Sequence, residues 1–213
     1  MKQLLIIMAA LTILSVSSFA QECGPGCPAC SGSGVNSSAL LAPGTISLSY
    51  LSIPGGEEEM GILNLRSGLT TWMNGGIGYA FQAEKIVWNL RLQAIAEEES
   101  GLRPAVIIGT GSVQTGESDQ SLYLQAAKNI EINEILTLSL SAGISSLIPD
   151  FDEVYGLAGA TMTLYESWSP FINFDGKSIH PGISWNHIEW LTITGMMIEG
   201  ETPAVLAGIQ YRI

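Results

Sequence analysis

The sequence feature that most constrains the fold is a two-residue alternation between large aliphatic side chains and small polar ones. Its clearest copy is residues 133–144. One set of alternate positions there holds Leu136, Leu138, Leu140, Ala142 and Ile144, and the other holds Thr137, Ser139, Ser141 and Gly143. A period of two is that of a β-strand, whose successive side chains point to opposite faces. A soluble half-buried strand usually carries long charged side chains on its wet face, so this pattern fits better to lipid outside and a crowded polar interior.

The same alternation recurs along the chain and predicts about twelve strands. We expect them from residue 45 and at residues 60–67, 73–82, 86–96, 103–113 and 120–128, then from residue 134 and at residues 155–166, 170–174, 178–185, 190–198 and 203–213. Bacterial single-chain barrels have an even number of antiparallel strands. The sequence therefore predicts an all-β fold, an antiparallel up-and-down transmembrane β-barrel that forms one domain over residues 45–213.

The composition is consistent with such a barrel and excludes other classes. Charged residues make up 13% of the chain and the mean hydropathy is +0.31. No apolar run after the N-terminal segment approaches the roughly 20 residues that a membrane-spanning helix needs. Only 8 Lys and Arg stand against 20 Asp and Glu, so the chain lacks the basic surface with which proteins bind nucleic acid.

The first 20 residues have the organisation of a secretory signal peptide. Lys2 supplies the positive start, residues 4–16 form the apolar core, and Ser18 and Ala20 place small side chains before a cleavage site. The apolar core is too short to span a membrane. We therefore expect cleavage before Gln21, export and, with the barrel pattern, localisation in the outer membrane of a Gram-negative envelope.

Three cysteines, Cys23, Cys27 and Cys30, follow the cleavage site in a Gly- and Ser-rich segment over residues 21–44 that we expect to be a flexible leader. Their spacing matches the cluster-binding signature of radical-SAM enzymes, whose compartment and fold an exported all-β chain does not offer. Three thiols are one short of a closed zinc site, and Ser31 stands where haem attachment requires His. We expect one local disulfide with a spare thiol, no metal site and no cofactor.

The connections between the expected strands fall into two sets. The odd-numbered set lies at residues 54–59, 83–85, 114–119, 146–154, 175–177 and 199–202. It contains the longer connections, whereas most even-numbered connections are short. Short periplasmic turns and longer outer loops are typical of outer-membrane barrels, so we expect both termini in the periplasm.

Four acidic groups would then share one rim, at residues 57–59, 117–119, 150–153 and 199–201. We expect this rim to be solvated rather than to hold divalent cations, as most charge clusters are. Residues 97–99 are also acidic but fall in the even set. This exception suggests a miscounted strand near residues 83–86.

Four of the five tryptophans lie near the expected periplasmic strand ends: Trp72, Trp168, Trp185 and Trp190. We interpret them as the interfacial girdle of a membrane barrel rather than as a platform for sugars. Three arginines alternate with apolar neighbours and are expected to face inward: Arg66, Arg91 and Arg212. There they would pair with carboxylates such as Asp175 or Glu189, and an interior rich in such pairs would be plugged rather than open.

One short pattern raises the question of catalysis. Ser178 and His180 share a strand face, which is similar to the arrangement in outer-membrane lipid A deacylases, and Asp175 or Glu189 could orient the histidine. Pro181 follows at once, however, and a Ser-x-His pattern is frequent in Ser-rich strands. We expect interfacial polar residues and assign no catalytic residue.

Two segments carry a family resemblance. Residues 67–79 resemble the strand–GLT–strand element of YjbH-like barrels, and residues 170–176 resemble that family's Glu-Tyr-Asp-Gly segment, with Asn173 and Phe174 in place of Glu and Tyr. The last strand also resembles the assembly signal of outer-membrane barrels, although the chain ends in Ile213 rather than an aromatic residue. The resemblance implies an outer-membrane barrel associated with exopolysaccharide production, and it assigns no site residue.

These observations predict a small porin-like outer-membrane barrel with a role in transport, export or envelope structure. The expected partners are outer-membrane lipids, the barrel-assembly machinery and polysaccharide or envelope proteins. One alternative is a secreted, soluble all-β binding protein, which the lack of charge on either strand face disfavours. A second alternative is an outer-membrane lipid-modifying hydrolase.

Overall fold

The computed structural model describes residues 40–54, 60–98, 101–112, 120–165, 167–188 and 190–213. The expected signal peptide and the three cysteines lie outside these ranges. No helix within the described ranges is long and apolar enough to cross a membrane.

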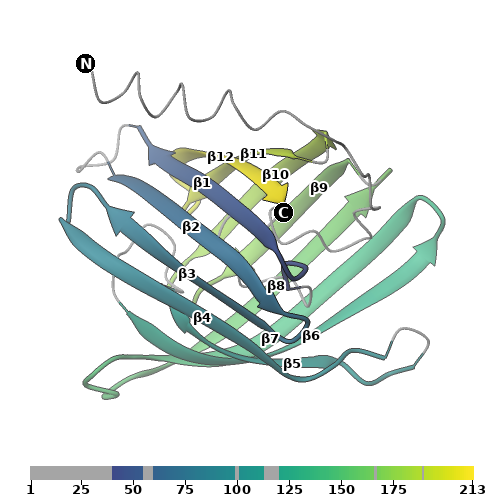
Figure 1. The fold of residues 1–213 in the computed structure, drawn as a ribbon, viewed down its shortest axis with the longest axis horizontal. Helices are drawn as coiled ribbons and strands as arrows, with labels where there is room; N and C mark the ends of the chain where they lie inside the picture. The colour runs from purple at the N-terminus through teal and green to yellow at the C-terminus, as the bar shows by residue number, and fades with distance from the viewer. Residues whose placement is uncertain (1–39, 55–59, 99–100, 113–119, 166, 189) are drawn as a thin grey trace.

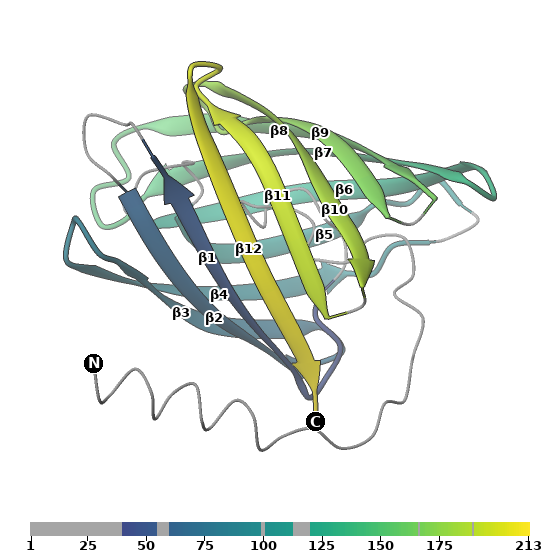
Figure 2. The ribbon, with the colours of Figure 1, turned by 90° about the horizontal axis from the view of Figure 1, so that it is seen from above.

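The described chain forms twelve antiparallel strands that close into a barrel through the pairing of the first strand with the last (Figures 1 and 2). Their bounds are β1 Thr45–Ile53, β2 Met60–Thr70, β3 Met73–Ala80, β4 Lys85–Ile95, β5 Ala105–Gly111, β6 Ser121–Asn133, β7 Leu136–Leu147, β8 Val154–Leu164, β9 Trp168–Phe174, β10 Ile179–Ile188, β11 Leu191–Ile198 and β12 Thr202–Arg212. Each strand pairs with its neighbours in sequence, which is the up-and-down order. The predicted fold class and strand number are therefore confirmed.

The strand faces are those expected from the alternation. In β7, Ser139, Ser141 and Ser145 are buried inside the barrel, whereas Leu140 and Ile144 are 42% and 52% exposed on the outside. Every second residue of β1 is buried and the residues between are exposed or half-buried, and β12 alternates between exposed and buried positions over residues 203–209. Large hydrophobic side chains are thus exposed all around the outer surface, which is the surface that lipid covers in a membrane barrel.

The two ends of the barrel differ in their connections. Thr45, the first residue of β1, pairs with Arg212 of β12, and the N–H of Ile213 donates to the carbonyl of Gly44 at 3.0 Å. We call this end, where both termini of the barrel lie, the terminal end. The opposite end, which we call the loop end, carries the six odd-numbered connections from β1–β2 to β11–β12.

Aromatic side chains gather at both ends on the outer surface. At the terminal end, Trp72, Trp168 and Trp190 are about half exposed, and the rings of Trp168 and Trp185 lie 6.3 Å apart. The strand ends expected for the four tryptophans are therefore confirmed. At the loop end, a second group of rings packs edge to face: Tyr50, Tyr79 and Phe81. Two such girdles are the arrangement that membrane barrels place at the two interfaces.

The acidic β4–β5 connection belongs to the terminal end, because β3 and β4 are separate strands. The suggested strand miscount near residues 83–86 is therefore wrong. The Glu97 carboxylate accepts hydrogen bonds from the backbone N–H of Asn129 at 2.6 Å and from its Nδ2 at 2.9 Å, and Lys128 Nζ lies 3.2 Å from Glu97 Oε1. β6 extends beyond its pairing with β5, so Glu97 satisfies a strand edge that would otherwise stay open.

Candidate functional site

The inner wall formed by β2, β3, β4 and β6 carries large polar side chains that we call the polar cluster: Arg66, Asn74, Arg91, Tyr123 and Gln125. They occupy inward positions, and Asn74, Arg91 and Gln125 are only 4%, 4% and 1% exposed. Asn74 pairs directly with Arg91, and Arg66 pairs with Gly76, two residues along β3. The two arginines therefore lie on either side of β3, on one wall.

Glycines on the same wall leave the space into which these side chains extend. A Cβ at Gly76 would lie 2.7 Å from Arg66 Cγ and 2.7 Å from Asn89 Oδ1. A Cβ at Gly109 would lie 2.4 Å from the Cζ and the hydroxyl of Tyr123. Real Cβ atoms do not approach other atoms so closely, so glycine is needed where a large neighbour crosses the strand. Gly76 and Gly109 thus make room for the polar side chains beside them.

Several buried polar atoms of the cluster have no partner among the described residues. Arg66 Nε, Asn74 Oδ1 and Gln125 Oε1 form no hydrogen bond there. A buried polar atom left unsatisfied costs about 1–3 kcal/mol. Water or a polar solute in the interior would satisfy these atoms, so the cluster is a candidate binding surface.

The ion pair expected for Arg66 is not formed within the described residues. Arg66 forms no ion pair with a described carboxylate, and Asp175 binds His180 at the loop end instead. Arg212 is exposed at the terminal end, and Glu189 lies outside the described residues. The expectation failed because alternation identifies inward positions but gives no height along the barrel. Asp175 follows the last residue of β9 at the loop end, whereas Arg66 lies well inside β2.

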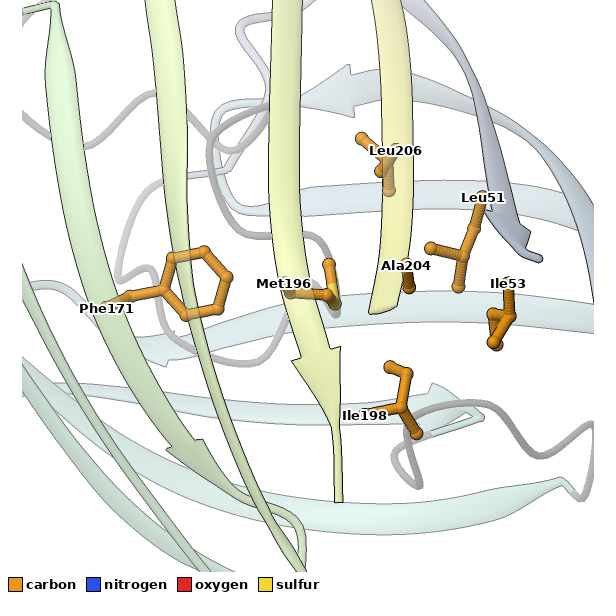
Figure 3. Packing of buried hydrophobic residues seen from close by; sticks show 7 residues of the cluster. All are labelled: Leu51, Ile53, Phe171, Met196, Ile198, Ala204 and Leu206. Carbon is orange, nitrogen blue, oxygen red and sulfur yellow. The ribbon is translucent and has the colours of Figure 1, made fainter. Parts of the chain in front are cut away.

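The opposite inner wall is apolar toward the loop end, a feature that the alternation of single strands did not predict. Buried side chains of β1, β9, β11 and β12 form one cluster (Figure 3): Leu51, Ile53, Phe171, Met196, Ile198, Ala204 and Leu206. Ile62 of β2 packs against it. The sequence signal was the loss of polar inward positions in these strands, as in residues 196–198 and 204–207, where both faces are apolar. The interior therefore has a polar cluster on one wall and an apolar cluster toward the loop end of the other.

A third group of side chains joins the β9–β10 and β11–β12 connections at the loop end. His180 is 1% exposed, and its Nε2 lies 2.8 Å from Asp175 Oδ2. Its Nδ1 accepts a hydrogen bond from the backbone N–H of Glu199 at 3.1 Å. Asp175 Oδ1 accepts from the N–H groups of Lys177 and Ser178, each at 3.0 Å. These contacts fasten two hairpins together, so we call Asp175, His180 and Glu199 the clasp.

The clasp bears on the hydrolase alternative. Because Nδ1 accepts from an N–H group, the proton of a neutral His180 lies on Nε2 and is donated to Asp175. The hydroxyl of Ser178 donates to Glu199 Oε1 at 3.3 Å rather than to the histidine. Both ring nitrogens of His180 are thus engaged by other groups, so the histidine is not placed to accept the proton of Ser178 as acyl transfer requires. This geometry favours a structural role for the Ser-x-His pattern.

The acidic groups provide no metal site within the described residues. No three His, Cys, Asp or Glu side chains lie close enough together there to hold an ion. The groups at residues 57–59 and 117–119 and the three cysteines lie outside the described ranges. The groups at residues 150–153 and 199–201 do lie at the loop end, as expected from the count of connections.

Comparisons with known proteins support the fold. No family model matches the sequence and no curated protein matches it, so the resemblance to YjbH-like barrels stays a prediction. Among solved structures, the chain is similar to a KdgM porin with a TM-score of 0.52 and 9% sequence identity, over 79% of this chain and 99% of that one. At this identity the match concerns the architecture, and the chain has the fold of a twelve-stranded porin-like β-barrel.

Proposed function

We propose that the protein is an outer-membrane β-barrel whose interior admits small anionic solutes. The observation that carries the proposal is the pair of arginines on one inner wall, Arg66 and Arg91, together with three buried atoms beside them, Arg66 Nε, Asn74 Oδ1 and Gln125 Oε1, that form no hydrogen bond with a described residue. A buried guanidinium group is costly unless an anion or water compensates its charge. A passing carboxylate or phosphate would supply both the charge and the hydrogen-bond acceptors.

The membrane part of the proposal has separate support. The outer surface exposes large aliphatic side chains on strand after strand and has aromatic side chains near both ends. Monomeric soluble proteins rarely expose apolar patches of more than a few hundred Å². A continuous apolar surface around a closed barrel is therefore difficult to reconcile with a soluble binding protein.

Ion selectivity in a planar bilayer tests the proposal, because the whole chain has a net charge of −12. The acidic loop end alone would favour cations, so a preference for anions would have to come from the interior. Under a salt gradient, we expect the reversal potential of the purified barrel to have the sign of an anion-selective channel. A cation preference would contradict the proposal.

The substitutions Arg66→Gln and Arg91→Gln test whether the anion preference comes from the polar cluster. A unit charge at about 4 Å contributes about 1 kcal/mol in water, which corresponds to about a fivefold change in occupancy. Each substitution should therefore lower the anion preference about fivefold. Arg212→Gln is the matched control, since this side chain is exposed at the terminal end. Equal effects of all three substitutions would place selectivity outside the polar cluster.

A finer version of the proposal concerns the solute. The resemblance of residues 67–79 and 170–176 to YjbH-like barrels suggests an acidic sugar polymer of the envelope. Such a solute combines carboxylates for the arginines with apolar ring faces for the opposite wall. We expect acidic oligosaccharides to interrupt the bilayer current at concentrations where neutral oligosaccharides of equal length do not. Equal interruption by both would reject this version and leave anion selectivity untouched.

A further inference from the structure

Residues 40–44 turn back into the barrel before β1 begins. The backbone N–H of Thr45 donates to the carbonyl of Ala42 at 3.0 Å, with Pro43 and Gly44 between them. Gly44 has a φ of +78°, and proline followed by a residue of positive φ is the pattern of a type II turn. The turn reverses the chain, so residues 40–42 run back along the barrel instead of leading away from it.

The reversed segment lies on the inner wall at Gly68. A Cβ on Gly68 would be 2.1 Å from the carbonyl oxygen of Ala42 and 2.6 Å from that of Leu41. Gly68 pairs with Asn74, whose side chain points inward, and paired residues of adjacent strands share a face. The N–H of Gly44 also donates to the carbonyl of Gly68 at 3.0 Å. The segment is therefore held against the inside of β2.

This position is close to the polar cluster. Gly68 and Arg66 are two residues apart on the same face of β2, a separation of about 7 Å. Asn74, the direct partner of Gly68, is itself a member of the cluster and pairs with Arg91. Leu41 is only 3% exposed, although it precedes the first strand at the terminal end of the barrel.

We propose that residues 40–44 form a strap that is seated on Gly68 and obstructs the way from the terminal end to the polar cluster. The absence of a side chain at residue 68 is what admits the strap, because any Cβ there would collide with backbone atoms. This gives a structural reason for the glycine in the Gly68-Leu69-Thr70 element. The obstruction rests on the proposed function, whereas the seating of the strap does not.

Cysteine labelling tests the seating. In a background with the native cysteines changed to serine, Leu41→Cys should react with a maleimide at least tenfold more slowly than Pro43→Cys, since Pro43 is exposed. Adding Gly68→Ala should abolish this protection. Gly208→Ala is the matched control, because it also faces inward but its Cβ would meet nothing closer than 3.5 Å. Rapid labelling of Leu41→Cys in the otherwise unchanged barrel would overturn the proposal.

Single-channel conductance tests the obstruction. Gly68→Ala should raise the conductance, and Gly208→Ala should not. Deletion of residues 40–43 should raise it as well, and this variant leaves the wall intact if Gly68→Ala fails to fold. If labelling shows that the strap is displaced and the conductance is nevertheless unchanged, the strap does not obstruct the interior.

If no barrel conducts, the proposed function fails, and labelling of Asn74→Cys decides the strap separately. The introduced cysteine should react slowly in the barrel that keeps Gly68 and residues 40–43, and fast in the variant that lacks residues 40–43. Slow labelling in both would reject the obstruction.

Discussion

Leu140→Arg separates a membrane barrel from a soluble one, because the same change has opposite consequences in the two. Leu140 is the fifth residue of β7 and is 42% exposed on the outer surface. At about 3.4 Å per residue it lies about 14 Å along the strand from Leu136. With a strand tilt of about 45°, that is about 10 Å from the terminal end, near the middle of an apolar band about 25 Å tall.

An arginine at the bilayer midplane costs about 2–4 kcal/mol. In a soluble barrel, the substitution would replace an exposed leucine by a charged residue and change stability by less than about 0.5 kcal/mol. Denaturant unfolding of the barrel reconstituted in lipid vesicles measures the difference. Ile132→Arg is the control, since Ile132 is also exposed but lies next to the β6–β7 turn, where the cost should fall below about 1 kcal/mol. An unaltered stability of Leu140→Arg in lipid would refute the assignment of this face.

Three further predictions concern the interior, the clasp and the leader. Gly109→Ala should destabilise the barrel by about 1–3 kcal/mol in the same unfolding assay, because its methyl group would collide with Tyr123. Gly156→Ala, whose methyl group meets nothing within 4 Å, should be neutral. Equal effects of the two substitutions would contradict the packing of Tyr123 against Gly109. His180→Phe should cost about 1.5–3 kcal/mol by removing the hydrogen bond that the buried Asp175 Oδ2 receives from the His180 ring, and a cost close to zero would show that the clasp does not hold the hairpins. Changing all three cysteines to serine should leave the heat-modifiable gel shift of the folded barrel intact, since they precede the first strand by more than ten residues, and loss of the shift would show that the leader takes part in folding.

Most of the architecture could be predicted from the alternation of large aliphatic and small polar residues along the sequence. In β7, the identity of each side chain determines its face, because a strand offers only two faces and lipid accepts only apolar groups on one of them. The strand count followed from the same rule, and the turn residues between the apolar runs set the hairpins. The positions of Trp72 and Trp190 could be predicted because the interfaces of a bilayer attract amphipathic rings.

The interior could be predicted less well, because its contacts join strands that are distant in sequence. Alternation placed Arg66 and Asp175 on the same face but gave no relative height, so the expected ion pair was wrong. The seat for the strap at Gly68 depends on the approach of backbone to backbone, which leaves no pattern other than a glycine. Glu97 caps the edge of β6 across 32 residues of sequence, and nothing local in its acidic neighbourhood indicates that contact.

The proposed function requires the barrel to span a membrane, and fractionation with a heat-modifiable gel shift tests this requirement. The protein expressed with its complete N-terminal sequence should be recovered in the outer-membrane fraction. Unheated samples should migrate differently from boiled ones, because a closed barrel resists detergent at room temperature. Recovery in the soluble periplasmic fraction, with the same mobility before and after boiling, would show that the barrel does not span the outer membrane.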